Sequence, residues 1–184
     1  IMPVTGFRMD SLMIVLIKFK SYKIASQGSI VLDLKNELHP LWRILLEEEE
    51  PLWRDRMYRF KFELEQYCEI YNLKLRVRVI SDKGFTCYVC VKGEMLQLQK
   101  LKAIISELNT DGFVVHLNDR NLALLPPYAS KRRAVTFLKN ILESEAKGHL
   151  TFVGLGDSLS DSAFMSICDF QMSPSNSQIS GILN

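Results

Sequence analysis

Residues Leu150 to Asp161 read LTFVGLGDSLSD, and this stretch is the most informative part of the chain. The apolar run 150–153 predicts a short strand, which the glycines after it turn toward the helix-like segment 162–167. Asp157 and Asp161 lie in that turn. Because neighbouring carboxylates repel each other, a bound cation would stabilise them, and Mg²⁺ prefers one or two carboxylates together with water and a substrate phosphate. The stretch therefore indicates metal-assisted phosphate chemistry.

A plain helix start accounts for the same two residues. An Asp at the N-cap and a second Asp in the first turn favour a helix through hydrogen bonding and the helix dipole. The spacing of Asp157 and Asp161 alone leaves both interpretations open.

The composition is that of an ordinary globular protein. Of 184 residues, 47% are hydrophobic and 24% charged, with a formal net charge of +2, so we expect one large domain or two small ones. The weak charge, with basic residues scattered among acidic ones, predicts no nucleic-acid partner. No apolar run is as long as a membrane span, so we also expect no membrane partner. The oligomeric state is left open.

The four cysteines predict free thiols. Cys87 and Cys90 form a C-x-x-C pattern, but residues 85–91 read as a strand, on which positions three apart point to opposite faces. This placement argues against a zinc or redox site. Buried thiols of this kind are typical of a reducing compartment, so we expect a cytoplasmic protein.

The chain divides into two compositional parts. Residues 35–125 predict helices and antiparallel hairpins, which is an α+β block, whereas the flanks 1–34 and 126–184 alternate strand and helix as in a parallel sheet. Within the block, Pro51 is expected to begin a new helical segment, and the acidic run Glu47 to Glu50 is expected to be a solvated face. The expected helices are 9–20, 41–71, 95–108 and 130–142, and the expected strands are 22–26, 29–33, 73–79, 85–91, 113–117, 122–125 and 150–153.

The chain begins with Ile1, and residues 1–6 read as the end of a strand entering a turn. A strand end with nothing before it is an unusual start for a natural protein. We therefore expect either upstream sequence or processing of a longer chain.

Three segments occur in a known order. Val4-Thr5-Gly6 ends a strand, Ser130-Lys131 opens a helix after the inserted block, and residues 156–161 close the set. In this order the sequence resembles the haloacid dehalogenase-like phosphohydrolases, most of all the branch with a large α+β cap, which includes sucrose-phosphate-phosphatase-like and other sugar-phosphate phosphatases. The resemblance covers nearly the whole chain. It implies an α/β fold, with a Rossmann-like parallel-sheet core that is incomplete at the N-terminus and residues 35–125 inserted as the cap domain.

The resemblance also implies a Mg²⁺-dependent phosphatase that acts on a small phosphorylated substrate, such as a sugar phosphate. Thr5 and Gly6 then match the motif that binds the transferring phosphoryl group, and Lys131 matches the lysine that neutralises phosphate and nucleophile charge. Two simpler interpretations stay open. Thr5 would serve equally as a helix N-cap, and Lys131, followed by Arg132 and Arg133, as a solvated helix-start lysine.

The motif at residues 156–161 implies the metal site. Asp157 and Asp161 match the acids that hold Mg²⁺ directly or through water, and Ser158 and Ser160 are placed to orient them by hydrogen bonds. In the cap, polar residues are candidates for binding sugar hydroxyls or a second charge, although each also reads as a solvent-facing strand or turn residue. They are Arg76, Arg78, His116, Asn118 and Arg120.

One departure from the family leaves the activity open. The first motif, Asp-x-Asp-x-Thr or Val, supplies the attacking carboxylate, and no Asp in this chain has an Asp two residues further on. The chain is then either the remainder of an active phosphatase or a natural non-catalytic member that binds phosphorylated sugars or a partner. Apart from the resemblance, residues 72–125 would also suit a small ligand-sensing or interaction module.

Overall fold

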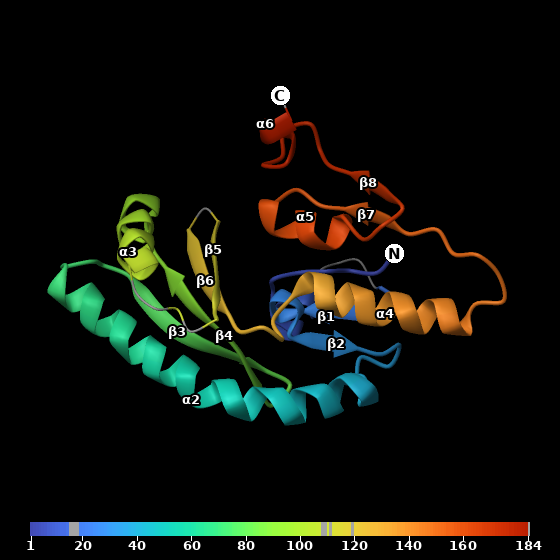
Figure 1. Ribbon diagram of the computed structural model, residues 1–184, viewed down its shortest axis with the longest axis horizontal. Helices are drawn as coiled ribbons and strands as arrows, with labels where there is room; N and C mark the ends of the chain where they lie inside the picture. The colour runs from blue at the N-terminus through green and yellow to red at the C-terminus, as the bar shows by residue number, and fades with distance from the viewer. Residues whose placement is uncertain (15–18, 108–109, 111, 119, 184) are drawn as a thin grey trace.

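The computed structural model describes residues 1–14, 19–107, 110, 112–118 and 120–183. Figure 1 shows two lobes joined along a long helix. We call residues 76–125 the sheet lobe, and residues 1–34 together with 126–183 the core lobe. The mixed α/β composition predicted from the sequence is confirmed.

The sheet lobe is built on two hairpins, as predicted. Its four antiparallel strands are hydrogen-bonded in the order β3-β4-β6-β5. Lys83 and Gly84, with φ of 50° and 85°, form the two-residue turn of the first hairpin, where positive φ is required at both positions. The strands are β3 (Arg76–Asp82), β4 (Phe85–Lys92), β5 (Val114–Asn118) and β6 (Asn121–Leu125), and Asp119, between β5 and β6, lies outside the described residues.

One face of this sheet is apolar and covered by helices. Val77, Val91 and Leu122 lie at paired positions across the three neighbouring strands and are buried. Helix α3 (Met95–Glu107) and the second half of α2 (Pro40–Ile70) pack on this side (Figure 1). Since side chains alternate along a strand, the polar residues between these positions lie on the opposite face.

Helix α2 runs through 31 residues without interruption, so the prediction that Pro51 begins a new segment is wrong. The prediction of a solvated acidic run is also wrong for Glu50, which is 1% exposed. Its carboxylate accepts hydrogen bonds from Arg54 at 2.9 and 2.6 Å and from the backbone N–H of Thr86 at 3.0 Å. These bonds fix the helix to β4 beside the proline, so tertiary contacts outweigh the low helix propensity of Pro51.

The first half of α2 packs on the core lobe instead. The Trp42 ring lies 5.0 Å from that of Phe137 in α4 (Lys131–Glu145), and the Trp42 indole donates to the Ser29 carbonyl at 2.8 Å. Arg133 forms an ion pair with Glu49 across the same contact. One helix therefore carries contacts of both lobes.

The core lobe contains the parallel pairing expected of the flanks. Val4 forms a parallel bridge to Ile24, and β7 (Val153–Leu155) pairs in parallel with β8 (Phe170–Met172). The strands β1 (Lys23–Ala25) and β2 (Ile30–Leu32) pair antiparallel, because the tight 3₁₀ turn η1 (Ser26–Gly28) reverses the chain between them. The core lobe is completed by α1 (Met9–Met13), α5 (Leu159–Met165) and α6 (Ser180–Leu183).

Several predicted boundaries in the core lobe differ from the structure, among them those of the first helix and of the strand before the Asp157 loop. Helix α1 ends at Met13 rather than continuing to residue 20, and residues 15–18 lie outside the described part of the chain. Strand β7 begins at Val153 instead of Leu150, because the N–H of Phe152 donates to the Asp169 carboxylate at 2.7 Å and is not available to a neighbouring strand.

All four cysteines are free, as predicted. Burial raises the pKa of the Cys87 thiol to about 12, which makes it a poor metal ligand at neutral pH. No helix in the described part of the chain has both the length and the apolar character needed to cross a membrane.

Candidate phosphate and metal site

Lys131 and Asp161 form a nearly buried ion pair in the core lobe. The Lys131 Nζ lies 2.7 Å from Asp161 Oδ1 and donates to the Ser160 hydroxyl at 3.3 Å. Both charged side chains are 10% exposed, so Lys131 is not a solvated helix-start lysine. A cation at the first position of a helix is disfavoured by the helix dipole. The ion pair compensates for that position and holds the ammonium group in place.

Asp161 also belongs to the start of α5. Ser158 is the N-cap, and its hydroxyl and N–H both donate to Asp161 Oδ2, at 2.8 and 3.3 Å, in a capping box. Burial works against the ionised carboxylate, but the hydrogen bond and charge of Lys131 together with the Ser158 bonds lower its pKa below the usual value. Asp161 is therefore ionised at neutral pH, with both oxygens already bonded.

Asp157 is placed differently from Asp161. It is exposed, and its backbone carbonyl accepts from the Gln178 N–H at 2.9 Å. The Gln178 side chain accepts from the N–H of Leu159 at 3.3 Å, so residues of the chain end hold the loop that presents Asp157. The N-cap interpretation does not apply to Asp157, since Ser158 occupies that position.

Of these two acids, only Asp157 offers a carboxylate that is free to bind a metal ion. In the described part of the chain, no three His, Cys, Asp or Glu side chains gather closely enough to hold a metal ion. Asp157 has a free carboxylate, whereas Asp161 is engaged by Lys131 and Ser158. Mg²⁺ binds one or two carboxylates in proteins and completes its coordination shell with water and phosphate oxygens. A site with the one free carboxylate of Asp157 is compatible with this preference.

Thr5 lies where the first segment meets β1. Its N–H donates to the Ile24 carbonyl at 3.0 Å, and its hydroxyl accepts from the N–H of Phe7 at 3.1 Å. It is not a helix N-cap: α1 follows Arg8, and the N–H of Met9 donates instead to the buried Asp82 carboxylate of the sheet lobe at 2.7 Å.

The turn η1 joins the Thr5 segment to the start of α4. Gln27 donates its N–H to the Thr5 carbonyl at 3.2 Å. Gly28 has φ +92°, and a Cβ on it would lie 2.3 Å from the backbone carbon of Ser130 and 2.5 Å from the nitrogen of Lys131. The turn η1 thereby contacts both the Thr5 segment and the start of α4, and Lys131 in turn contacts Asp161 directly. No motif in the sequence indicated this close approach of Gly28 to Ser130 and Lys131.

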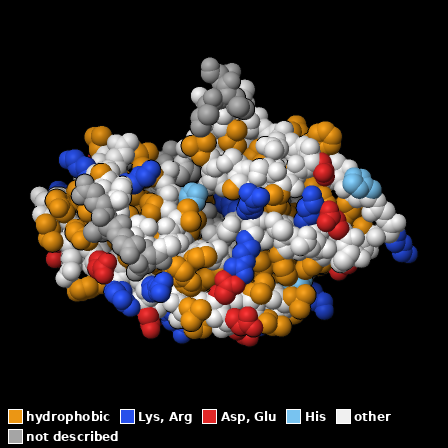
Figure 2. Space-filling model, in the orientation of Figure 1, with side chains coloured by type: hydrophobic (Ala, Val, Ile, Leu, Met, Phe, Trp, Pro, Cys, Tyr) orange, Lys and Arg blue, Asp and Glu red, His pale blue; other side chains and the backbone are white. Residues whose placement is uncertain are grey.

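The polar face of the sheet lobe is turned toward this site. The Tyr88 hydroxyl donates to the Gly6 carbonyl at 3.3 Å, and the Asn118 side chain accepts from Gln178 Nε2 at 3.0 Å. His116 lies on β5 of the same lobe. Burial, and to a lesser extent the charges of Lys131 and Lys102, lowers its pKa, so the His116 side chain is uncharged at neutral pH. Figure 2 shows Lys or Arg and His side chains gathered where the two lobes meet. Of these residues, Tyr88 and Gln178 carried no signal in the sequence.

Known proteins resemble the chain in fold but not in sequence. No family model matches it, and no curated protein matches it. Among solved structures, the sucrose-phosphatase of Synechocystis, in complex with sucrose and phosphate, is 17% identical with a TM-score of 0.63 over 99% of this chain and 72% of that one. The trehalose-6-phosphate phosphatase C-terminal domain of C. albicans is 14% identical, with a TM-score of 0.62 over 90% of this chain and 58% of its own. A haloacid dehalogenase-like hydrolase of B. subtilis is 14% identical, with a TM-score of 0.60 over 97% and 78%.

At these identities the likeness concerns the fold alone. The chain has a haloacid dehalogenase-like fold of the kind found in sugar-phosphate phosphatases, an α/β core with a cap, as the order of its motifs predicted.

Proposed function

We propose that the chain with this fold binds the phosphoryl group of a small phosphorylated metabolite, of the sugar-phosphate type, together with Mg²⁺. The observation that carries the proposal is the buried pair of Lys131 and Asp161, set beside the Thr5 segment and the exposed Asp157. Residues 1–34 and 126–184 would act as the phosphatase-like core domain, and residues 35–125 as the cap domain. The expectation of a cytoplasmic location rests on the free cysteines.

Each residue has a definite part in this proposal. The Lys131 ammonium, held in one place by Asp161 and Ser160, would neutralise the phosphate oxygens. The Thr5 hydroxyl and the Gly6 backbone would hydrogen-bond the same group. Asp157 would hold Mg²⁺, with Asp161 acting through water and Ser158 keeping Asp161 in place. The bound metal would supply charge neutralisation at the phosphate.

Hydrolysis would need a further group. In this fold family a carboxylate of an Asp-x-Asp motif attacks phosphorus, and the chain has no such pair. We therefore propose an aspartyl-phosphate type of site whose nucleophile is missing from this chain, which binds phosphate but does not turn it over. The alternative is a non-catalytic phosphosugar-binding or interaction module. The lack of an Asp-x-Asp motif in this chain also favours this alternative, and a phosphosugar-binding module would bind the same phosphorylated ligand.

Calorimetry tests the binding step. Titration with glucose 6-phosphate should give binding that strengthens when Mg²⁺ is added, and Asp157→Asn should remove the strengthening while leaving the fold intact, since Asp157 is exposed. Glu48→Gln, an equally exposed change on α2, should behave as the wild type. Binding that is indifferent to both Mg²⁺ and Asp157→Asn would refute the proposed metal site. Release of phosphate by this chain in the presence of EDTA would refute the proposed chemistry.

A further inference from the structure

The polar face of the four-stranded sheet is turned toward the phosphate site at two points. Tyr88 bonds to the backbone of Gly6, and Asn118 bonds to Gln178, which in turn holds the Asp157 loop. Residues of β4 on the same face, two apart along the strand, are Tyr88, Cys90 and Lys92. A molecule bound at Thr5 and Lys131 would therefore extend along this face.

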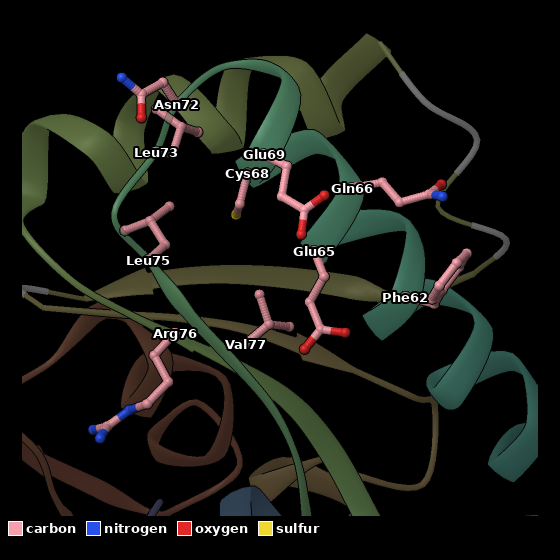
Figure 3. A pocket seen from close by; sticks show the side chains of 10 residues that line it. All are labelled: Phe62, Glu65, Gln66, Cys68, Glu69, Asn72, Leu73, Leu75, Arg76 and Val77. Atoms are coloured by element: carbon pink, nitrogen blue, oxygen red, sulfur yellow. The ribbon is translucent and has the colours of Figure 1, made fainter.

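Three cations occupy the outer half of that face. Arg76 lies directly opposite Lys92 in the register of β3 and β4, and Arg78 lies directly opposite Cys90. Figure 3 shows the side chains of Arg76 and Val77 pointing to opposite sides of β3, and both residues line the groove between β3 and α2. Burial raises the pKa of the Cys90 thiol, and the charges of Lys92, Arg76 and Arg78 all act to lower it.

These cations have no anionic partner among the described residues. The ion pairs of the described chain involve other side chains, and none includes Arg76, Arg78 or Lys92. The described strand positions on this face carry no carboxylate. Like charges directly opposite each other destabilise a sheet. An anion bound over this face, close to Arg76 and Lys92, would therefore stabilise the pair of strands.

The distance along the strand sets the scale of the ligand. With a rise of about 3.3 Å per residue, Cys90 lies roughly 7 Å and Lys92 roughly 13 Å beyond Tyr88. A ligand that runs along this face from Tyr88 to the cations must therefore cover about the length of a hexose or a disaccharide.

We propose that Arg76, Arg78 and Lys92 bind a second anionic group of the substrate, so that the preferred ligand is a phosphorylated sugar or sugar acid with a phosphate or carboxylate at its far end. This inference rests on the proposed function, because the first phosphate is taken to lie at Thr5 and Lys131. The arginines bind such groups through planar, bidentate hydrogen bonds, and the lysine adds a point charge.

Matched ligand pairs test the inference by calorimetry. Glucose 6-phosphate and 6-phosphogluconate differ by a terminal carboxylate, and fructose 6-phosphate and fructose 1,6-bisphosphate differ by a terminal phosphate. We expect the doubly anionic member of at least one pair to bind about tenfold more tightly. The pair that shows the difference identifies the second group as a carboxylate or a phosphate.

Substitutions then locate the effect. Arg78→Gln should abolish most of the tenfold preference and leave binding of the monophosphates unchanged. Lys100→Gln, an exposed change of the same charge on α3, should leave both unchanged. Equal binding of both members of each pair overturns the inference while the proposed function stands, provided that the monophosphates bind. A preference that survives Arg78→Gln also overturns it, and failure of every phosphorylated probe overturns both proposals.

Discussion

At the scale of single residues, the site depends on the carboxylate of Asp161, which makes two separate contacts. Asp161 pairs with Lys131 and closes the capping box of α5, and the ion pair requires the ionised form. The sequence predicted Asp161 and Lys131 as partners of one site only through the order of motifs, because 30 positions separate them. It could not indicate that the Lys131 ammonium would contact both Asp161 and the adjacent Ser160, since this depends on how α4 and α5 pack.

The ion pair predicts a pH dependence of stability. The pKa of Asp161 is lowered in the folded state, so its contribution is present above the ordinary value of 3.8 and is lost as the pH falls from there through the lower folded pKa. Asp161→Asn should cost about 2 to 4 kcal/mol of unfolding free energy at pH 7, because Lys131 is left without its partner. In urea unfolding followed by circular dichroism, this difference from the wild type should shrink below pH 4.

The neighbouring acid provides the control. Asp157→Asn, at an exposed position, should change the unfolding free energy by less than about 0.5 kcal/mol at either pH. A gap between the wild type and Asp161→Asn that stays constant from pH 7 to pH 3 would contradict the assigned role of the ion pair.

At the scale of elements, the hairpins and most helices follow from local pattern, and α2 does not. The alternation of residues 73–79 and the Lys83-Gly84 turn indicate the first hairpin, although β3 begins and ends three residues later than predicted, at Arg76 and Asp82. Pro51 signals a helix start by every local rule, yet α2 continues through it. The difference comes from the contact of Glu50 with β4, about 36 residues away, which no local pattern contains.

Glu50→Gln should therefore weaken the attachment of α2 to the sheet. The amide keeps the shape of the side chain but loses the charge in its bonds to Arg54 and to the Thr86 N–H, which should cost about 1 to 3 kcal/mol of unfolding free energy. Chemical denaturation measures the loss. Glu48→Gln, two residues earlier and exposed, should cost less than about 0.5 kcal/mol. Equal effects of the two substitutions would show that Glu50 does not hold the helix.

At the scale of the whole molecule, the two lobes are joined by α2 and by small polar contacts across the site. The division into a block at 35–125 and two flanks was read from composition, but the contacts between them were not. Gln178, which lies outside every predicted helix and strand, bonds both to the Asp157 loop and to Asn118 of the sheet lobe. Such contacts join residues 60 positions apart and leave no trace in periodicity.

Gln178→Ala should loosen the Asp157 loop. Its side chain accepts the N–H of Leu159, so we expect amide hydrogen exchange in a peptide covering residues 157–162 to become about fivefold faster, as for the loss of one hydrogen bond. Gln171→Ala, at an exposed position on β8, should leave this peptide unchanged. Unchanged exchange after Gln178→Ala would show that the loop is held by other contacts.

The close approach at Gly28 also has an evolutionary consequence. Every missense change in a glycine codon introduces a larger side chain, and any Cβ at this position would lie within 2.5 Å of the backbone that begins α4. The positive φ adds a second penalty for every other residue. Natural sequences that descend from the same ancestor and keep Lys131 are thus expected to retain glycine here, even where the surrounding residues have diverged beyond recognition.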